Sequence, residues 1–153
     1  MLLCAGAGLV FLAFAAFAVA LEIGYFPGTV AVAGEDLPDF VVSLLREEGV
    51  LEPEESVLYY YSGGLIDYME DGNLCTDRRV ISYFTSAEEL YVESTAYADI
   101  VRLEVDPADG WMSDATLHVE ARTGEVITLY VAGEDGGDEA FEAALRRAWR
   151  RAR

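Results

Sequence analysis

Lysine is absent from the 153 residues, and histidine occurs only once. The ten cationic side chains are all arginines, against 28 Asp and Glu, so the formal net charge at pH 7 is −18. A chain with this charge repels the phosphate backbone of DNA and RNA at long range. We therefore predict no nucleic-acid partner. The same composition is compatible with a GC-rich genome and with adaptation to high salt.

Cysteine is also scarce: Cys4 lies in a hydrophobic run and Cys75 in a predicted strand. These positions are poor partners for a disulfide, and the sequence has no Cys/His spacing suited to zinc. The one histidine, His118, falls on the outward phase of its predicted strand. Its surroundings in the sequence supply neither a nucleophile nor an orienting group for general-base catalysis. We therefore predict no cofactor and no enzymatic activity.

The first 26 residues form a separate segment. Residues 1–21 carry no charged side chain and are followed by Glu22. As a helix, about 21 residues span roughly 32 Å, which is enough to cross the hydrocarbon core of a bilayer. Tyr25 and Phe26 then fall where interfacial aromatic residues occur. We expect residues 2–21 to cross the lipid bilayer once and to hold the protein at the cell membrane, with either orientation open.

A second interpretation of this segment is a cleaved signal peptide. Ala18-Val19-Ala20 has the small-x-small pattern of a cleavage site. Cleavage there would release a secreted or periplasmic α+β binding domain. The length of the apolar run, and the lack of Lys or Arg before it, favour the anchor.

The remaining sequence predicts helix, then strands, then helix. Residues 27–50 indicate a linker and one short helix, because apolar residues recur at helical spacing over 38–48 before Gly49. From residue 57 the hydrophobic period becomes two, and tight-turn residues separate the runs, as in antiparallel sheets. The predicted strands are 57–61, 74–76, 80–84, 90–94, 100–105, 115–122 and 125–131, with 65–69 as a further candidate. A closing helix is predicted over 138–153, with apolar residues at every fourth position from 141 to 149.

One strand–turn–strand segment carries a family resemblance. Residues 72–83 read Gly-Asn-Leu-Cys-Thr-Asp-Arg-Arg-Val-Ile-Ser-Tyr. This resembles the G-x-L-x-L-T-D-R-R-L-I-x-Y signature of the bacterial PH-like domain family, whose members are often membrane-tethered. Residues 97–100, Tyr-Ala-Asp-Ile, resemble its Y-x-x-I pattern, and residues 140–149 resemble its C-terminal helix. The similarity extends over about two-thirds of the chain.

The resemblance implies a fold and a type of role. The fold is mainly β with helices (α+β), as a seven-stranded, partly open barrel over residues 51–153, capped by the C-terminal helix. The role is binding or scaffolding without catalysis. Eukaryotic PH domains that bind phosphoinositides use basic residues in the first hairpin loop. The corresponding loop here, 62–71, contains Asp67, Glu70 and Asp71 and no cation.

Arginines supply the candidate interaction surface: Arg78, Arg79, Arg146, Arg147, Arg150 and Arg151. The pair in the turn either binds an anion or pairs with neighbouring acids; the second is favoured, because Asp77 can accept backbone hydrogen bonds there. The C-terminal arginines either complement the helix dipole and pair with the acidic body, or contact anionic lipid near the anchor. We expect a membrane-tethered PH-like module that binds or assembles with a protein partner.

Overall fold

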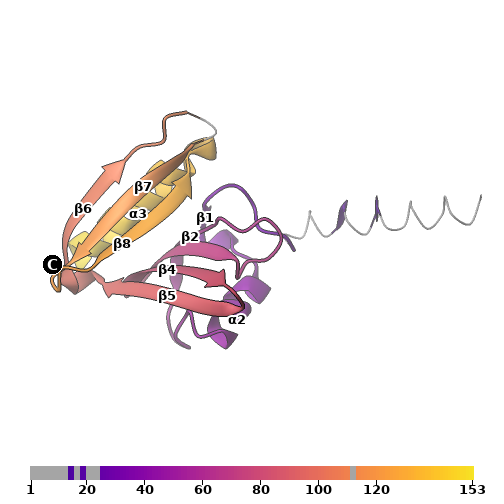
Figure 1. Ribbon diagram of the computed structural model, residues 1–153, viewed down its shortest axis with the longest axis horizontal. Helices are drawn as coiled ribbons and strands as arrows, with labels where there is room; N and C mark the ends of the chain where they lie inside the picture. Colours follow the sequence, from indigo (N-terminus) through magenta and orange to yellow (C-terminus); the bar gives the residue numbers. More distant parts are fainter. Residues whose placement is uncertain (1–13, 16–17, 20–24, 111–112) are drawn as a thin grey trace, which may run out of the picture.

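The computed structural model describes residues 14–15, 18–19, 25–110 and 113–153 (Figure 1). The predicted membrane segment, 1–26, therefore lies almost wholly outside the described residues. Among the helices within the described ranges, none combines the length and the hydropathy needed to cross a bilayer.

Within residues 25–153, the described chain forms eight strands, the α-helices α2 and α3, and three short 3-10 helices. The strands are β1 (Val32–Ala33), β2 (Val57–Ser62), β3 (Asp71–Thr76), β4 (Arg79–Ser86), β5 (Glu89–Ala96), β6 (Ile100–Asp106), β7 (Asp114–Ala121) and β8 (Val126–Ala132). The helices are η1 (Gly34–Asp36), α2 (Asp39–Glu47), η2 (Tyr97–Asp99), η3 (Glu134–Gly136) and α3 (Gly137–Arg151).

The strands form two antiparallel sheets, with the orders β1-β2-β3-β4-β5 and β6-β7-β8. The prediction of a mainly β domain with a C-terminal helix is confirmed. The resemblance implied a seven-stranded, partly open barrel; in the described residues the strands divide into two sheets, and neither sheet closes on itself. The division falls where η2 turns the chain between β5 and β6, so that β6 pairs with β7 and leaves the first sheet.

The prediction of a further strand at 65–69 is wrong, because this segment is the loop between β2 and β3. Its backbone groups bond locally: the Leu65 amide donates to Glu70 Oε2 at 2.8 Å, and the Met69 amide donates to Asp67 Oδ1 at 2.9 Å. Leu65 and Ile66 are both exposed. The apolar pair therefore has no sheet face against which to pack.

Helix α2 covers one face of the five-stranded sheet. Val41 and Leu45, one turn apart, are both fully buried. They belong to a hydrophobic cluster that includes Leu74, Ile81 and Tyr83 of the sheet. The helix ends before Gly49, whose φ of +77° suits glycine at a helix C-terminus.

Helix α3 packs into the opening between the two sheets. Its buried residues Phe141 and Leu145 join a cluster that also contains Cys75 and Val80 of the first sheet and Leu117 of the second. The far end of the helix is fixed by a hydrogen bond from Trp149 Nε1 to the Ile100 carbonyl oxygen at 3.2 Å. Burial of this apolar face holds the two sheets around one helix.

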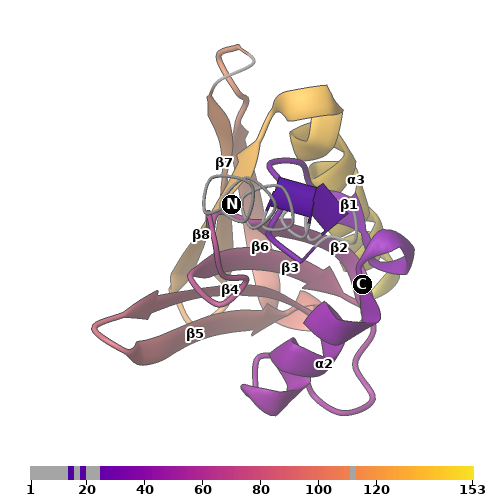
Figure 2. The ribbon, with the colours of Figure 1, turned by 90° about the vertical axis from the view of Figure 1, so that its right-hand side faces the viewer.

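The two ends of the described domain lie far apart. In Figure 1 the chain enters from the N-terminal segment on the right, while α3 ends on the left beside η2. The turned view of Figure 2 places α2 below the five-stranded sheet and α3 beside the β1–β2 edge. The C-terminal arginines are therefore at the end of the domain remote from Tyr25.

Candidate functional site

A groove runs between α3 and strand β2. Its main part has a volume of ≈ 350 Å³ and is lined by ten residues: Ala33, Gly34, Glu35, Val57, Leu58, Tyr59, Ala144, Arg147, Ala148 and Arg151. A second hollow, of ≈ 240 Å³, shares Leu58, Ala148 and Arg151 with the first and extends to Asp77 and Arg78. We call the two hollows together the α3–β2 groove. Its floor is apolar, and charged side chains stand along its rims.

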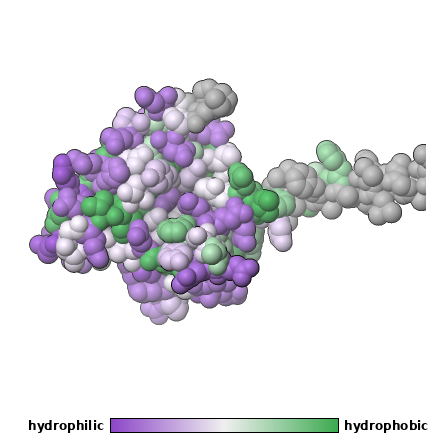
Figure 3. Space-filling view, viewed as in Figure 1, coloured by the Kyte–Doolittle hydropathy of each residue, from purple (hydrophilic) through white to green (hydrophobic). Residues whose placement is uncertain are grey.

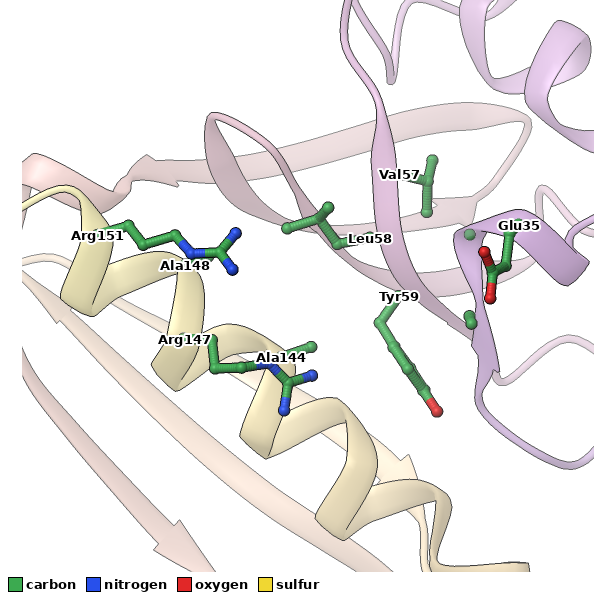
Figure 4. A pocket seen from close by; sticks show the side chains of 10 residues that line it. Glu35, Val57, Leu58, Tyr59, Ala144, Arg147, Ala148 and Arg151 are labelled. Atoms are coloured by element: carbon green, nitrogen blue, oxygen red, sulfur yellow. The ribbon is translucent and has the colours of Figure 1, made fainter.

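The helix side of the groove carries Arg147 and Arg151 (Figure 4). They are four residues apart, so both project from the same side of α3, next to the buried face that holds the helix on the sheets. Within the described ranges, no carboxylate lies within the 4.0 Å ion-pair distance of either guanidinium. In a chain of net charge −18, these two cations are thus without an acidic partner among the described residues.

The opposite side of the groove is built from η1 and β2. Figure 4 shows Glu35 there, across the groove from the two arginines. The backbone of Gly34 lies so close to β2 that a Cβ at this position would collide with the Val57 carbonyl oxygen. Within the described residues, β1 pairs only with Tyr59 and Tyr60, which leaves the first part of β2 beside the groove.

The Thr-Asp-Arg-Arg turn is held by acids, as the favoured interpretation predicted. Asp77 Oδ1 accepts a hydrogen bond from the Ser56 amide at 2.9 Å. Arg79 contacts Glu55 through two hydrogen bonds, Nε to Oε1 at 3.0 Å and Nη2 to Oε2 at 2.9 Å. Arg78 Nη1 pairs with Glu52 Oε2 at 2.8 Å at the surface. These contacts hold the segment before β2 against the β3–β4 connection, and we call this set of contacts the clamp.

Glu55 is the buried centre of this clamp. Thr76 Oγ1 also donates to its Oε1 at 2.6 Å, and the Glu52 amide donates to its Oε2 at 3.1 Å. Burial raises the pKa of the Glu55 carboxyl, but the hydrogen bonds from Arg79, Thr76 and the Glu52 backbone outweigh it and hold the pKa below its ordinary value. The hydrogen bond with Glu55 in turn raises the pKa of Arg79. Arg79 is therefore part of the fold, with its charge already paired.

The structure separates the six predicted arginines into two groups. Arg147, Arg151 and Arg78 line the groove. The others do not: Arg79 faces Glu55, Arg146 pairs with Glu142 on its own helix, and Arg150 is exposed outside both hollows. No sequence pattern pointed to Glu35 or Leu58, because their place in the groove depends on how β1 and β2 meet α3.

His118 lies on the three-stranded sheet, away from this groove. Its Nδ1 is 3.1 Å from Thr128 Oγ1, and its Nε2 is 3.7 Å from Asp106 Oδ2. Among the described residues, no group of three or more His, Cys, Asp or Glu side chains is placed to hold a metal ion. The α3–β2 groove combines a hollow surface with two arginines that have no acidic partner among the described residues.

Comparison with known proteins defines the fold class. No protein-family model and no curated protein matches this sequence. The chain is similar to a DUF1696 family protein with a pleckstrin-homology domain from Shewanella loihica PV-4: TM-score 0.53, 19% identity, 80% of this chain and 99% of that one. It is also similar to a pleckstrin homology domain from Shewanella amazonensis SB2B: TM-score 0.52, 20% identity, 71% of this chain and 87% of that one. The chain therefore has the fold of a bacterial PH-like domain, as the resemblance implied.

Proposed function

We propose that this protein is a PH-like, non-enzymatic interaction module, and that its α3–β2 groove binds an acidic, extended segment of a partner protein. One observation supports this most strongly. Arg147 and Arg151 stand over an apolar floor with no acid within ion-pair distance in the described residues, on a domain that otherwise has a large excess of acids.

The spacing of the two arginines defines the ligand. Four residues of helix rise by about 6 Å. Two residues of an extended chain advance by about 6.6 Å. A partner with Glu or Asp at alternate positions therefore places one carboxylate on each guanidinium. The intervening side chains of the partner face the other way, and its backbone runs over the apolar floor around Leu58.

The charge of the domain contributes selectivity. The field of a protein with net charge −18 disfavours acidic ligands in general. Only a ligand that places its carboxylates at both arginines gains local attraction that offsets this repulsion. Specificity of this kind relies on excluding the wrong partners as well as on contacts with the right one.

We further propose that residues 2–21 hold the module at the cell membrane. The uncharged run of 21 residues supports this, and the cleavage pattern at Ala18–Ala20 supports the secreted or periplasmic alternative. An intact protein that resists alkaline extraction of membranes would favour the anchor. A soluble protein whose N-terminus begins at Leu21 would establish cleavage.

The position of the groove favours a protein ligand over anionic lipid. In Figure 1, α3 ends at the C-terminal mark, on the side of the domain opposite to the N-terminal segment. With the chain anchored by residues 2–21, the C-terminal end of α3 is then remote from the bilayer. Binding of the tail arginines to anionic vesicles is thus the competing outcome.

The test is a titration with a designed peptide. Full-length protein in non-ionic detergent is titrated into a dye-labelled peptide that carries Glu at alternate positions, and anisotropy is recorded; the same peptide with Gln for Glu is the control ligand. Loss of two exposed ion pairs at about 1 kcal/mol each predicts that Arg147→Gln/Arg151→Gln weakens binding roughly 30-fold.

A matched variant separates the groove from charge alone. Arg146→Gln/Arg150→Gln removes the same charge from the same helix at the same spacing, but neither residue lines the groove. We expect it to bind within about threefold of the unmodified protein. Equal loss in both double variants, or equal affinity for the Gln peptide, would contradict the proposal.

A further inference from the structure

A set of exposed apolar side chains surrounds the point at which the chain enters the domain. Its members are Tyr25, Phe40 of α2, and Leu65 and Ile66 of the β2–β3 loop, with 59%, 42%, 84% and 69% of their surface exposed. We call this set the exit patch. Figure 3 shows hydrophobic atoms gathered where the domain meets the N-terminal segment. Exposed apolar groups concentrated in one place indicate an interaction surface.

The exit patch comes from three parts of the chain, namely the start of the domain, α2 and the β2–β3 loop, and aromatic contacts join them. The Tyr25 and Phe40 rings stack with their centroids 6.2 Å apart. Phe40 meets the Tyr68 ring edge-on, with centroids 5.8 Å apart. Tyr68 Oη donates a hydrogen bond to the Phe26 carbonyl oxygen at 3.0 Å. The start of the domain, α2 and the β2–β3 loop are thus fixed relative to one another.

The tip of the β2–β3 loop, Leu65 and Ile66, is exposed to the surroundings of the domain. The Gly64 amide bonds to Ser62 Oγ at 3.2 Å, and the Leu65 amide bonds to Glu70 Oε2 at 2.8 Å. These bonds satisfy the loop backbone without any sheet partner at the tip. Leu65 and Ile66 are therefore presented to the surroundings on an internally bonded loop.

Chain length limits what can cover this patch. The uncharged run ends at Leu21, and residues 22–24 are all that separate it from Tyr25. Leu21 and Tyr25 are four residue steps apart, which span at most about 14 Å when fully extended. If residues 2–21 cross a bilayer, Tyr25 must lie within that distance of the membrane interface, and Phe40, whose ring stacks on Tyr25, lies beside it. A soluble partner or a second copy would have to fit between the patch and the bilayer.

We infer that the exit patch rests on the bilayer, with Leu65 and Ile66 inserted among the lipids and Tyr25 and Phe40 at headgroup level. Aromatic residues are favoured at this depth. The inference rests on the proposed membrane anchor and goes beyond it, because it assigns a second membrane contact. Two contacts define an orientation of the domain on the membrane.

The experiment measures the environment of residue 66 in the full-length protein. In a Cys4→Ser background, Ile66→Cys is labelled with an environment-sensitive fluorophore; Cys75 is fully buried and does not compete for the label. The protein is reconstituted into phosphatidylcholine vesicles with and without nitroxide-bearing lipid. Val126→Cys is the matched control, since Val126 is an exposed apolar residue on β8 of the other sheet.

We expect the label at residue 66 to shift to shorter wavelength in vesicles and to be quenched by nitroxide lipid, while the label at residue 126 does neither. Protein that floats with the vesicles but keeps a solvent-like, unquenched label at 66 overturns the inference and leaves the anchor intact. A shift that depends on protein density and is not quenched by the lipid assigns the patch to a second copy, and also overturns it. Protein that fails to float overturns both the anchor and this contact.

Discussion

The clamp around Glu55 predicts a large difference between two neighbouring glutamates. Glu55 is completely buried and bonds to Arg79, whose side chain is 22% exposed. Glu52 pairs with Arg78 at the same turn, but both of these side chains are largely exposed. Both pairs join a glutamate to an arginine, but the Glu55 pair is buried and Glu55 accepts further hydrogen bonds from Thr76 and the Glu52 amide.

The expected magnitudes follow from that difference. Glu55→Ala leaves the guanidinium of Arg79 without its acid and removes the bond with Thr76. Loss of one member of a buried ion pair is destabilising by about 3–5 kcal/mol. Because Arg79 retains some contact with solvent, we expect about 3 kcal/mol. Glu52→Ala breaks an exposed pair, so its effect on the free energy of unfolding should stay between about 0 and 1 kcal/mol.

Unfolding in urea, followed by circular dichroism on full-length protein in non-ionic detergent, measures both variants. A change of about 3 kcal/mol is a large part of the 5–15 kcal/mol by which domains are typically stable. It corresponds to a melting temperature lower by about 10 °C for a chain of this size. If Glu55→Ala and Glu52→Ala destabilise equally, burial does not decide the strength of the clamp and the reasoning fails.

Three further predictions concern the pKa of Glu55, the close approach of Gly34 to β2 and the burial of Cys75. Because the pKa of Glu55 is lowered in the folded state, its stabilising effect is complete above the unfolded pKa of about 4.3 and is lost as the pH falls through the folded value. The stability difference between the unmodified protein and Glu55→Gln should therefore shrink below about pH 4. A constant difference in urea midpoint from pH 7 to 3 would refute this. Gly34→Ala should lower the urea midpoint, because its Cβ collides with the Val57 carbonyl oxygen. Gly28→Ala is the control and should leave the midpoint unchanged, because no atom lies within 4 Å of its Cβ. Equal midpoints for the two variants would refute the close approach of Gly34 to β2. Burial raises the pKa of the Cys75 thiol, so in a variant without the other cysteine it should react with a thiol reagent only after denaturation, and rapid reaction of the native protein would contradict its placement.

The strands and helices could be predicted where the local pattern carried the information. The alternation in residues 115–131 matches β7 and β8, where every second residue is buried; in β6 Leu103 and Val105 are partly buried, but Val101 is exposed. The segment 65–69 has the same apolar character but lies in a loop, since its backbone bonds to Glu70 and Asp67 instead of to a strand. Periodicity alone does not distinguish a buried apolar pair from an exposed one.

The candidate site was only partly predictable for a related reason. The six arginines could be selected by composition, but nothing in the sequence separated Arg147 and Arg151 from Arg146 and Arg150, which have the same i,i+4 spacing. Whether an arginine is paired depends on residues distant in sequence, as with Arg79 and Glu55, which are 24 positions apart. The opposite side of the groove comes from η1, whose approach to α3 depends on the packing of the whole domain.

The central claim, that Arg147 and Arg151 receive an acidic segment, is tested most directly by the side-chain Nε resonances of the arginines in full-length protein labelled with ¹⁵N-arginine. The ten arginines give ten signals, each assignable by substitution. On addition of the peptide with Glu at alternate positions, we predict that the signals of Arg147 and Arg151 move most and saturate together. Uniform small shifts, or larger shifts at Arg146 and Arg150, would place the acidic ligand elsewhere and contradict the account.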